Sequence, residues 1–177
     1  MTNIEPLTDI AGVLRVELVA HKDDRGRLIE TFRQEWLGDL PQMVQGTRSD
    51  SKKGVVRALH YHRKQADYWY VPLGTLVCGL YDLRRSSPTR GASATVELAD
   101  EVALYIPPGV AHGFQALTDV TLTYLVDQAY DASDEYGLAW DDPDVAIPWP
   151  LQSEAILSER DRTNPRLKEI PDDELPA

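Results

Sequence analysis

Two histidine-bearing stretches decide the fold of this chain: Gly54-Val-Val-Arg57-Ala-Leu-His60-Tyr-His62 and Pro107-Pro-Gly-Val-Ala-His112-Gly-Phe114. In a β-strand, side chains alternate between the two faces, so His60 and His62 point to the same side. A second strand can bring His112 close to them. Three imidazoles would then converge in one cavity, where they would either bind a metal ion or move a proton.

Around these stretches the chain consists of short apolar segments that alternate with polar residues and are separated by turns such as 24–26, 73–74 and 107–109. This pattern predicts many strands and little helix, which favours a double-sheet jelly roll. We expect one domain over residues 1–177, a helix over 33–40 that stops at Pro41, and a loose acidic tail over 170–177. The predicted strands are 13–19, 28–32, 55–61, 68–73, 76–83, 94–98, 103–106, 113–117 and 120–126.

Composition narrows the classes of partner. The 177 residues carry a formal net charge of −11, which argues against nucleic acid or an anionic membrane as the main partner. The single cysteine, Cys78, excludes an internal disulfide. There is no apolar run typical of export or membrane insertion, so we expect a cytoplasmic protein.

Residues 54–74 fit the first motif of the metal-binding cupin pattern, with Gly54, His60, His62, an acid at Asp67, and Gly74. The pattern has Glu where this chain has Asp67, and the second half, around His112, has Glu101 and Ala116 in place of a glycine and an asparagine. Two imidazoles, a carboxylate and a further imidazole suit zinc, iron or manganese. One hypothesis is therefore a metal-dependent isomerase or oxygenase that uses His60, His62, Asp67 and His112.

A longer series of motifs favours another member of the same fold. In order along the chain they are 24–32 (Asp-Arg-Gly-Arg-Leu-Ile-Glu-Thr-Phe), 56–61, 82–89, 106–114, 140–143, 148–150 and 157–161. Together they resemble the dTDP-4-dehydrorhamnose 3,5-epimerase family over roughly residues 10–168. The resemblance implies an all-β, double-stranded β-helix (cupin) jelly roll with short peripheral helices. It also implies a homodimer that needs no metal or other cofactor and inverts carbon 3, carbon 5 or both beside the 4-keto group of a dTDP-sugar.

The resemblance also assigns roles to residues. His60 would be the base, Asp161 the carboxylate that orients its imidazole, and Tyr124 the acid that returns the proton from the opposite face. Tyr124 belongs to the apolar row Val120, Leu122, Tyr124 and Val126, which is consistent with a phenol that points inward. The substrate-binding residues implied are Arg25 and Arg57 for the diphosphate, Glu30 and Gln45 for the nucleotide or sugar, and His112 beside the substrate.

Several positions depart from the family pattern. His62 replaces a glutamine, Asp67 or Tyr68 falls where a lysine is expected to stabilise the enolate, and Cys78 replaces an aspartate. Where the family pattern has two aromatic residues after Tyr124, this chain has Ala129-Tyr130. These changes leave open which carbon is inverted, and they admit a third hypothesis, a non-catalytic protein that binds a sugar nucleotide.

Overall fold

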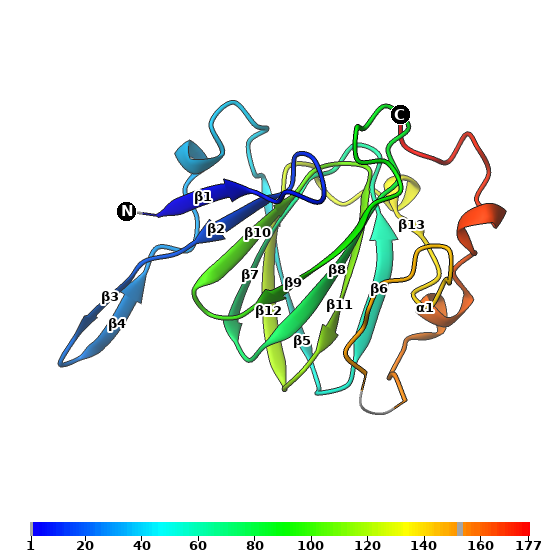
Figure 1. Cartoon of the computed structure of the whole chain (residues 1–177). Helices are drawn as coiled ribbons and strands as arrows, with labels where there is room; N and C mark the ends of the chain where they lie inside the picture. Colours follow the sequence, from blue (N-terminus) through cyan, green and yellow to red (C-terminus); the bar gives the residue numbers. More distant parts are fainter. Residues whose placement is uncertain (1, 152–153) are drawn as a thin grey trace.

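Two antiparallel sheets packed face to face form the body of the protein (Figure 1). The computed structural model describes residues 2–151 and 154–177, and the strand orders below refer to these residues. The first sheet has the order β1 (Asn3–Pro6), β2 (Leu14–Glu17), β10 (Val102–Ile106), β7 (Asp67–Leu73), β12 (Val120–Val126) and β5 (Gln45–Ser51). The second has the order β13 (Tyr136–Gly137), β6 (Val56–Tyr61), β11 (Val110–Ala116), β8 (Leu76–Asp82) and β9 (Ser93–Leu98). The predicted all-β jelly roll is confirmed.

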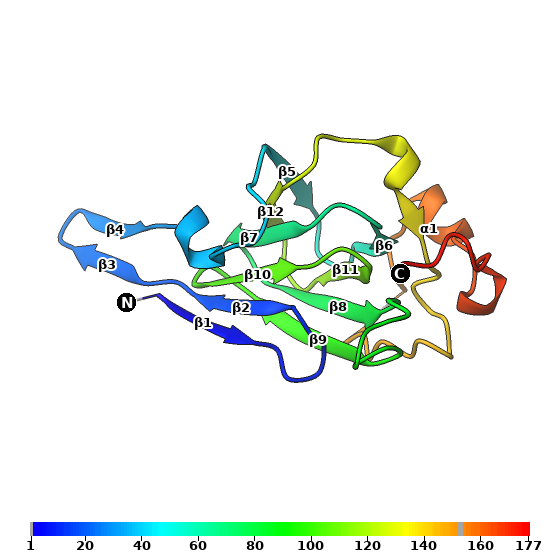
Figure 2. The same ribbon diagram turned by 90° about the horizontal axis from the view of Figure 1, so that it is seen from above.

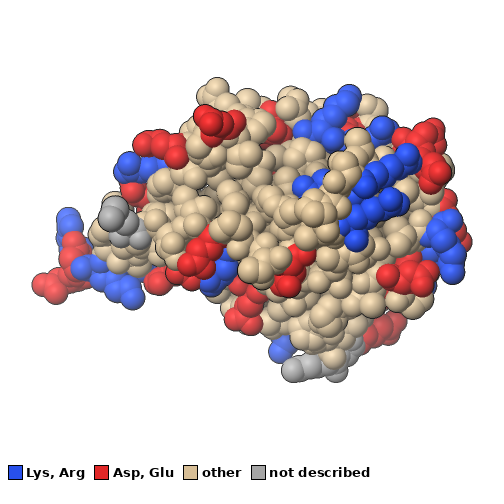
Figure 3. Space-filling view, turned by 45° about the horizontal axis from the view of Figure 1, so that its top comes forward, with Lys and Arg blue, Asp and Glu red and all other residues tan. Residues whose placement is uncertain are grey.

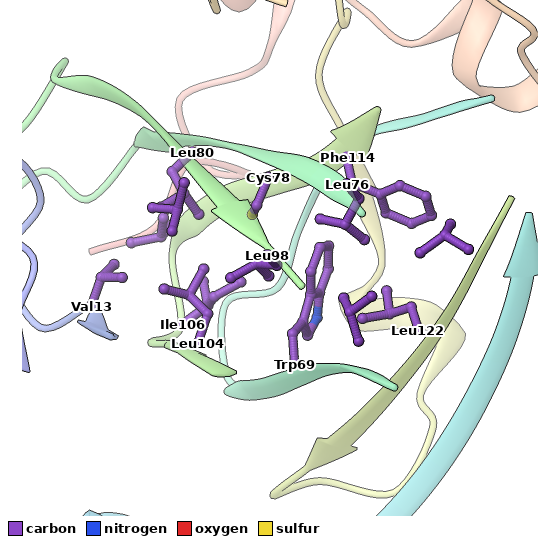
Figure 4. Packing of buried hydrophobic residues seen from close by; sticks show 14 of the residues in the cluster. Val13, Trp69, Leu76, Cys78, Leu80, Leu98, Leu104, Ile106, Phe114 and Leu122 are labelled. Carbon is purple, nitrogen blue, oxygen red and sulfur yellow. The ribbon is translucent and has the colours of Figure 1, made fainter. Parts of the chain in front are cut away.

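The main hydrophobic core lies between the inner faces of these sheets (Figure 4). Trp69 of β7 and Leu122 of β12 meet Leu76 of β8 and Phe114 of β11, and the Trp69 and Phe114 rings pack edge to face at 5.9 Å. Burying each such side chain contributes about 1.5–3 kcal/mol to folding. Cys78 is fully buried in the same core. The core thus fixes the distance between the two sheets, and the site described below depends on that distance.

Each predicted strand segment overlaps a strand of the structure, and segment 120–126 coincides with β12. The sequence patterns missed β1, β3, β5 and β13. The reason is clearest for β5, whose sequence Gln-Gly-Thr-Arg-Ser-Asp-Ser has no apolar alternation. It is an edge strand, so its outward side chains meet water, and its inward ones line a polar cavity instead of the core.

The predicted helix over 33–40 is wrong, because only a 3-10 turn forms there, at Gln34–Leu37. Arg33 offers no side-chain cap to its first turn, and Gly38 ends it with a φ of 59°. Eight residues without a good cap cannot sustain a helix by themselves. The α-helix of the structure, α1 (Glu159–Thr163), has five residues, and none of the described helices is long and apolar enough to cross a bilayer.

Residues 170–177, which composition predicts to be loose, pack against the body of the protein. Ile170 is buried, Leu175 joins the hydrophobic cluster outside the second sheet, and the backbone N–H of Arg85 donates to the carbonyl of Pro176 at 3.2 Å. Asp172 and Asp173 are exposed, whereas Ile170 and Pro176 are buried, so the acidic composition of the segment did not reveal that its apolar residues pack inward.

A two-stranded hairpin, β3 (Ala20–Asp23) and β4 (Gly26–Ile29), extends away from both sheets (Figure 2). Its residues are mostly exposed, including the apolar Leu28 at 64%. An isolated two-stranded hairpin is marginally stable in water, so this one needs another surface to hold it.

Candidate active site

A cavity of about 230 Å³ opens between the two sheets. One wall comes from β5, β7 and β12 of the first sheet, and the other from β6 and β11 of the second. Five residues predicted for the epimerase line it, namely Gln45, Arg57, His60, His112 and Tyr124, and so do His62 and Asp67 of the metal hypothesis. The cavity adjoins the main hydrophobic core, because three residues of that core, Trp69, Phe114 and Leu122, also line the cavity.

His60 and Asp161 form a close polar pair at this cavity. The Nε2–H of His60 donates to Oδ1 of Asp161 over 2.7 Å, although the two residues are 101 positions apart in the chain. Because the carboxylate takes the hydrogen on Nε2, the lone pair of the neutral imidazole is on Nδ1. His60 therefore has one nitrogen held in place and the other able to accept a proton.

The position of Asp161 is fixed by the start of α1. Ser158 caps this helix: its hydroxyl accepts from the backbone N–H of Asp161 at 3.1 Å and donates to Oδ2 of Asp161 at 2.9 Å. Burial acts to raise the pKa of the Asp161 carboxyl, but the hydrogen bond and charge of His60, together with the Ser158 hydroxyl, outweigh it and lower that pKa. Asp161 is thus a carboxylate at neutral pH, and it holds Nε2 of His60 in place.

Tyr124 lies on the opposite wall, in β12, while His60 lies in β6 of the other sheet. Burial raises the pKa of the Tyr124 phenol, and a hydrogen bond with Thr47 opposes the shift without cancelling it. The phenol consequently keeps its proton at neutral pH. A molecule held between the sheets would have an imidazole on one side and a proton donor on the other.

His62, Asp67 and His112 form a separate buried group beside His60, and their ligand atoms all lie within 4.8 Å of one another. His112 is directly opposite His60 in the pairing of β11 with β6. Burial lowers the pKa of His112 to about 4, although Asp67 opposes the shift, so its imidazole is neutral. The metal hypothesis named four residues. The structure brings three of them together, namely His62, Asp67 and His112, whereas His60 is hydrogen-bonded to Asp161.

Arg57 and Gln45 lie at the polar side of the cavity. The Nε–H of Arg57 donates to the Ser51 hydroxyl at 3.0 Å, and Oε1 of Gln45 accepts from the backbone N–H of Tyr130 at 3.1 Å. Around Arg57 the described lining contains three carboxylates, those of Asp67, Asp131 and Glu135. Figure 3 shows that charges of both signs are interspersed over the surface, with Lys and Arg gathered on the right of that face. The cavity itself is short of positive charge.

Arg25 and Glu30 lie outside this cavity. Arg25 is at the tip of the β3–β4 hairpin, where its side chain is 89% exposed and pairs with Asp23. Glu30 follows the same hairpin and pairs with Arg33. Within one chain the structure does not bring these two residues to the other predicted site residues.

The sequence patterns missed several residues at the site. Thr47 and Ser49 line the cavity from β5, and Gln65, Trp69 and Glu135 line it from other segments. The period of two in Gln45, Thr47 and Ser49 was the available signal for the β5 wall. Glu135 has no such signal, because it lies in a segment outside the long strands.

The fold and the cavity define a class of protein, a jelly roll with a histidine–carboxylate pair on one wall of the cavity between its sheets and a phenol on the other. The chain belongs to the dTDP-4-dehydrorhamnose 3,5-epimerase family, whose model matches residues 7–169.

Individual relatives agree with this membership. The dTDP-4-dehydrorhamnose 3,5-epimerase of Methanothermobacter thermautotrophicus is 36% identical over 93% of this chain and 94% of its own length. The dTDP-6-deoxy-D-glucose-3,5-epimerase of Legionella pneumophila, solved with dTDP-4-keto-L-rhamnose, has a TM-score of 0.93 and 32% identity over 99% of this chain and 98% of that one. A 3'-monoepimerase of Streptomyces bikiniensis, solved with dTDP-quinovose, has a TM-score of 0.86 and 34% identity over 92% and 87%. As the function of the chain, neither the metal-dependent isomerase or oxygenase nor the non-catalytic binding protein is favoured by these relatives.

Proposed function

We propose that this protein epimerises a dTDP-4-dehydro-6-deoxy-hexose at carbon 3, carbon 5 or both. The observation that carries the proposal is the 2.7 Å His60–Asp161 pair on one wall of a cavity whose opposite wall carries Tyr124. Epimerisation beside a ketone requires removal of a proton from one face of the sugar and delivery of a proton to the other. A base and an acid on opposing sheets meet that requirement.

In the first step His60 takes the proton next to the 4-keto group through Nδ1, and the electron pair moves onto the ketone oxygen as an enolate. Asp161 holds the ring and stabilises the imidazolium that forms. In the second step Tyr124 gives its proton to the other face of the same carbon, which inverts it. Tyr124 suits this role because its raised pKa keeps the proton in place until the enolate draws it.

The nucleotide part of the substrate is anionic, and Arg57 is the guanidinium available at the cavity. A planar guanidinium forms paired, charge-assisted bonds with phosphate oxygens. Gln45 supplies a neutral polar contact from β5, and His112 lies on the facing wall beside the substrate. The binding roles of these residues follow from their place at the cavity and from the family resemblance.

The proposal is tested by incubating the protein with dTDP-4-dehydro-6-deoxy-glucose in deuterium oxide and following the sugar by NMR. We expect deuterium at carbon 3, carbon 5 or both, together with an inverted product. Deuterium at one carbon alone would identify a mono-epimerase, as in the Streptomyces bikiniensis relative. If neither carbon exchanges, the proposed function is wrong.

We further propose a homodimer in which the β3–β4 hairpin of one chain reaches the cavity of its partner. Three observations support this arrangement: the hairpin extends away from its own sheets, it exposes Leu28, and it carries Arg25 away from its own cavity (Figure 2). Arg25 would add the second positive charge that the cavity lacks, and the dimer would bury the exposed hairpin. Closed twofold dimers are the commonest homo-oligomers.

A complementation experiment tests the dimer. Arg25→Ala and His60→Ala each damage a different part of a shared site, so each variant alone should be nearly inactive. If the chains exchange, a 1:1 mixture contains about half heterodimers with one intact site each, which restores about a quarter of wild-type activity. Light scattering should give twice the chain mass of 19.9 kDa. A monomer in solution, or a mixture no more active than its components, would contradict the arrangement.

A further inference from the structure

Three buried side chains at the cavity take no part in the proposed proton transfer. They are His62 directly after β6, Asp67 at the start of β7 and His112 in β11. The His62 and His112 rings lie 5.6 Å apart between centroids, and Nε2 of His112 is 3.8 Å from Oδ2 of Asp67. Segments from both sheets therefore converge at one point of the cavity wall.

The hydrogen bonds of the two imidazoles fix their tautomers. Nδ1 of His62 is 2.9 Å from the carbonyl oxygen of Asp134, and Nδ1 of His112 is 2.9 Å from the carbonyl oxygen of Val110. A carbonyl oxygen only accepts, so both Nδ1 atoms carry the hydrogen, and in the neutral form of each ring Nε2 carries the lone pair. Histidines that bind metals have this arrangement, with one ring N–H donated to a backbone carbonyl and the other nitrogen free.

Asp67 is oriented in a similar way. Its Oδ1 accepts from the side-chain amide of Gln65 at 2.9 Å, and its Oδ2 accepts from the indole N–H of Trp69 at 3.0 Å. These bonds hold the carboxylate in place and leave it further lone pairs. At 3.8 Å, Oδ2 of Asp67 is too far from Nε2 of His112 for a hydrogen bond.

We propose that His62, Asp67 and His112 bind a divalent transition-metal cation. Two imidazole nitrogens and one carboxylate oxygen are a donor set suited to zinc, iron, manganese or cobalt, and the cavity side of the group leaves a position open. Among the described residues the hydrogen bonds of both imidazoles are made through Nδ1, so each Nε2 is available to a cation. This site revises the expectation of a protein without a cofactor, and it differs from the four-ligand set predicted from the sequence because His60 is excluded.

The cation site also bears on how the enolate is stabilised in a chain that lacks the family lysine. The family lysine aligns with Asp67 or Tyr68, so the side chain expected to stabilise the enolate is missing. A cation held by Asp67 would place positive charge on the wall next to His60. This catalytic role, unlike the binding site itself, rests on the proposed function.

Cation binding is tested on the protein alone. After treatment with a chelator, the chain is titrated with Co²⁺, followed by visible absorption, and with Zn²⁺, followed by elemental analysis. We expect one ion per chain and a rise in melting temperature with Zn²⁺. Asp67→Asn, His62→Gln and His112→Gln should each weaken binding by about a hundredfold or more, because each removes a direct ligand.

Two matched controls separate this site from other histidines. His21→Gln changes an exposed hairpin residue, and His60→Gln changes the one cavity histidine that is held by Asp161; both should bind Co²⁺ as the wild type does. Asp67→Asn preserves the shape of the side chain, so we expect this variant to fold. Circular dichroism and the melting temperature check that expectation. No binding to the wild type, or equal binding by all variants, would overturn the site.

No sugar is present in these titrations, so their result is independent of the epimerase assay. A protein that fails to exchange deuterium can still bind the cation, and the reverse also holds. The catalytic role is tested by running the exchange assay with the chelated protein and again after Zn²⁺ or Mn²⁺ is added. Exchange that is restored at least tenfold supports the role, and exchange that does not depend on the cation overturns it.

Discussion

His60→Gln will lower the rate of deuterium exchange into the sugar by about two to four orders of magnitude at every carbon that the wild type exchanges. Glutamine keeps much of the length and polarity of the side chain but cannot accept the proton. The loss should therefore appear in kcat, with little change in KM, because the nucleotide is bound by other groups. Single-turnover NMR in deuterium oxide measures this effect.

Asp161 supplies the control for this experiment, because it acts through His60. Asp161→Asn should slow exchange by itself, since an amide neither orients the ring in the same tautomer nor stabilises the imidazolium. The double variant should be no slower than His60→Gln alone, since residues that act as one unit are not additive. A tenfold or smaller loss in His60→Gln, or additive losses in the double variant, would contradict the assignment of His60 as the base.

Tyr124→Phe will lower formation of the inverted product by about two to four orders of magnitude while sparing more of the deuterium exchange. The phenol is needed only for delivery of the proton to the second face. In its absence His60 can still remove a proton, exchange it with solvent and return deuterium to the same face. Exchange with retention of configuration is therefore the expected signature, and NMR distinguishes it from inversion.

Tyr70→Phe is the matched control, because it removes a phenolic oxygen from a strand next to Tyr124 but outside the cavity. The Tyr70 hydroxyl donates to Asp100 at 3.2 Å and does not line the site. Its loss should leave product formation within about twofold of the wild type, as for most substitutions away from a functional site. If Tyr124→Phe forms inverted product at a tenth of the wild-type rate or faster, another group is the acid.

Most of the strands were predictable because the alternation of apolar and polar residues along a strand involves only residues close together in the sequence. Val120 to Val126 places alternate side chains in the core and is found as β12. The missed strand β5 shows the limit of this signal. Its inward residues, Gln45, Thr47 and Ser49, line the cavity instead of packing in the core, so this strand has no hydrophobic pattern.

The residues of the candidate site were predictable to a different extent. His60 and His112 could be expected to meet, because two strands of one sheet can pair, and they are direct partners in β6 and β11. The metal hypothesis grouped His60 with them by spacing alone. In the structure His60 is separated from the other metal-site residues, because Nε2 of His60 is hydrogen-bonded to Asp161, which lies 101 residues further along the chain. No local pattern contains that contact.

The sequence by itself determined the alternation of the strands, the turns between them, the ordered motifs of the family and the residue types available for proton transfer. The tertiary structure decided which of those side chains meet: Asp161 with His60, His62 and His112 with Asp67, and Tyr124 on the facing sheet. The physical reason is that periodicity depends on neighbours a few residues apart, whereas a site depends on distances between segments far apart in the chain. Those distances are set by the packing of the two sheets on their shared core.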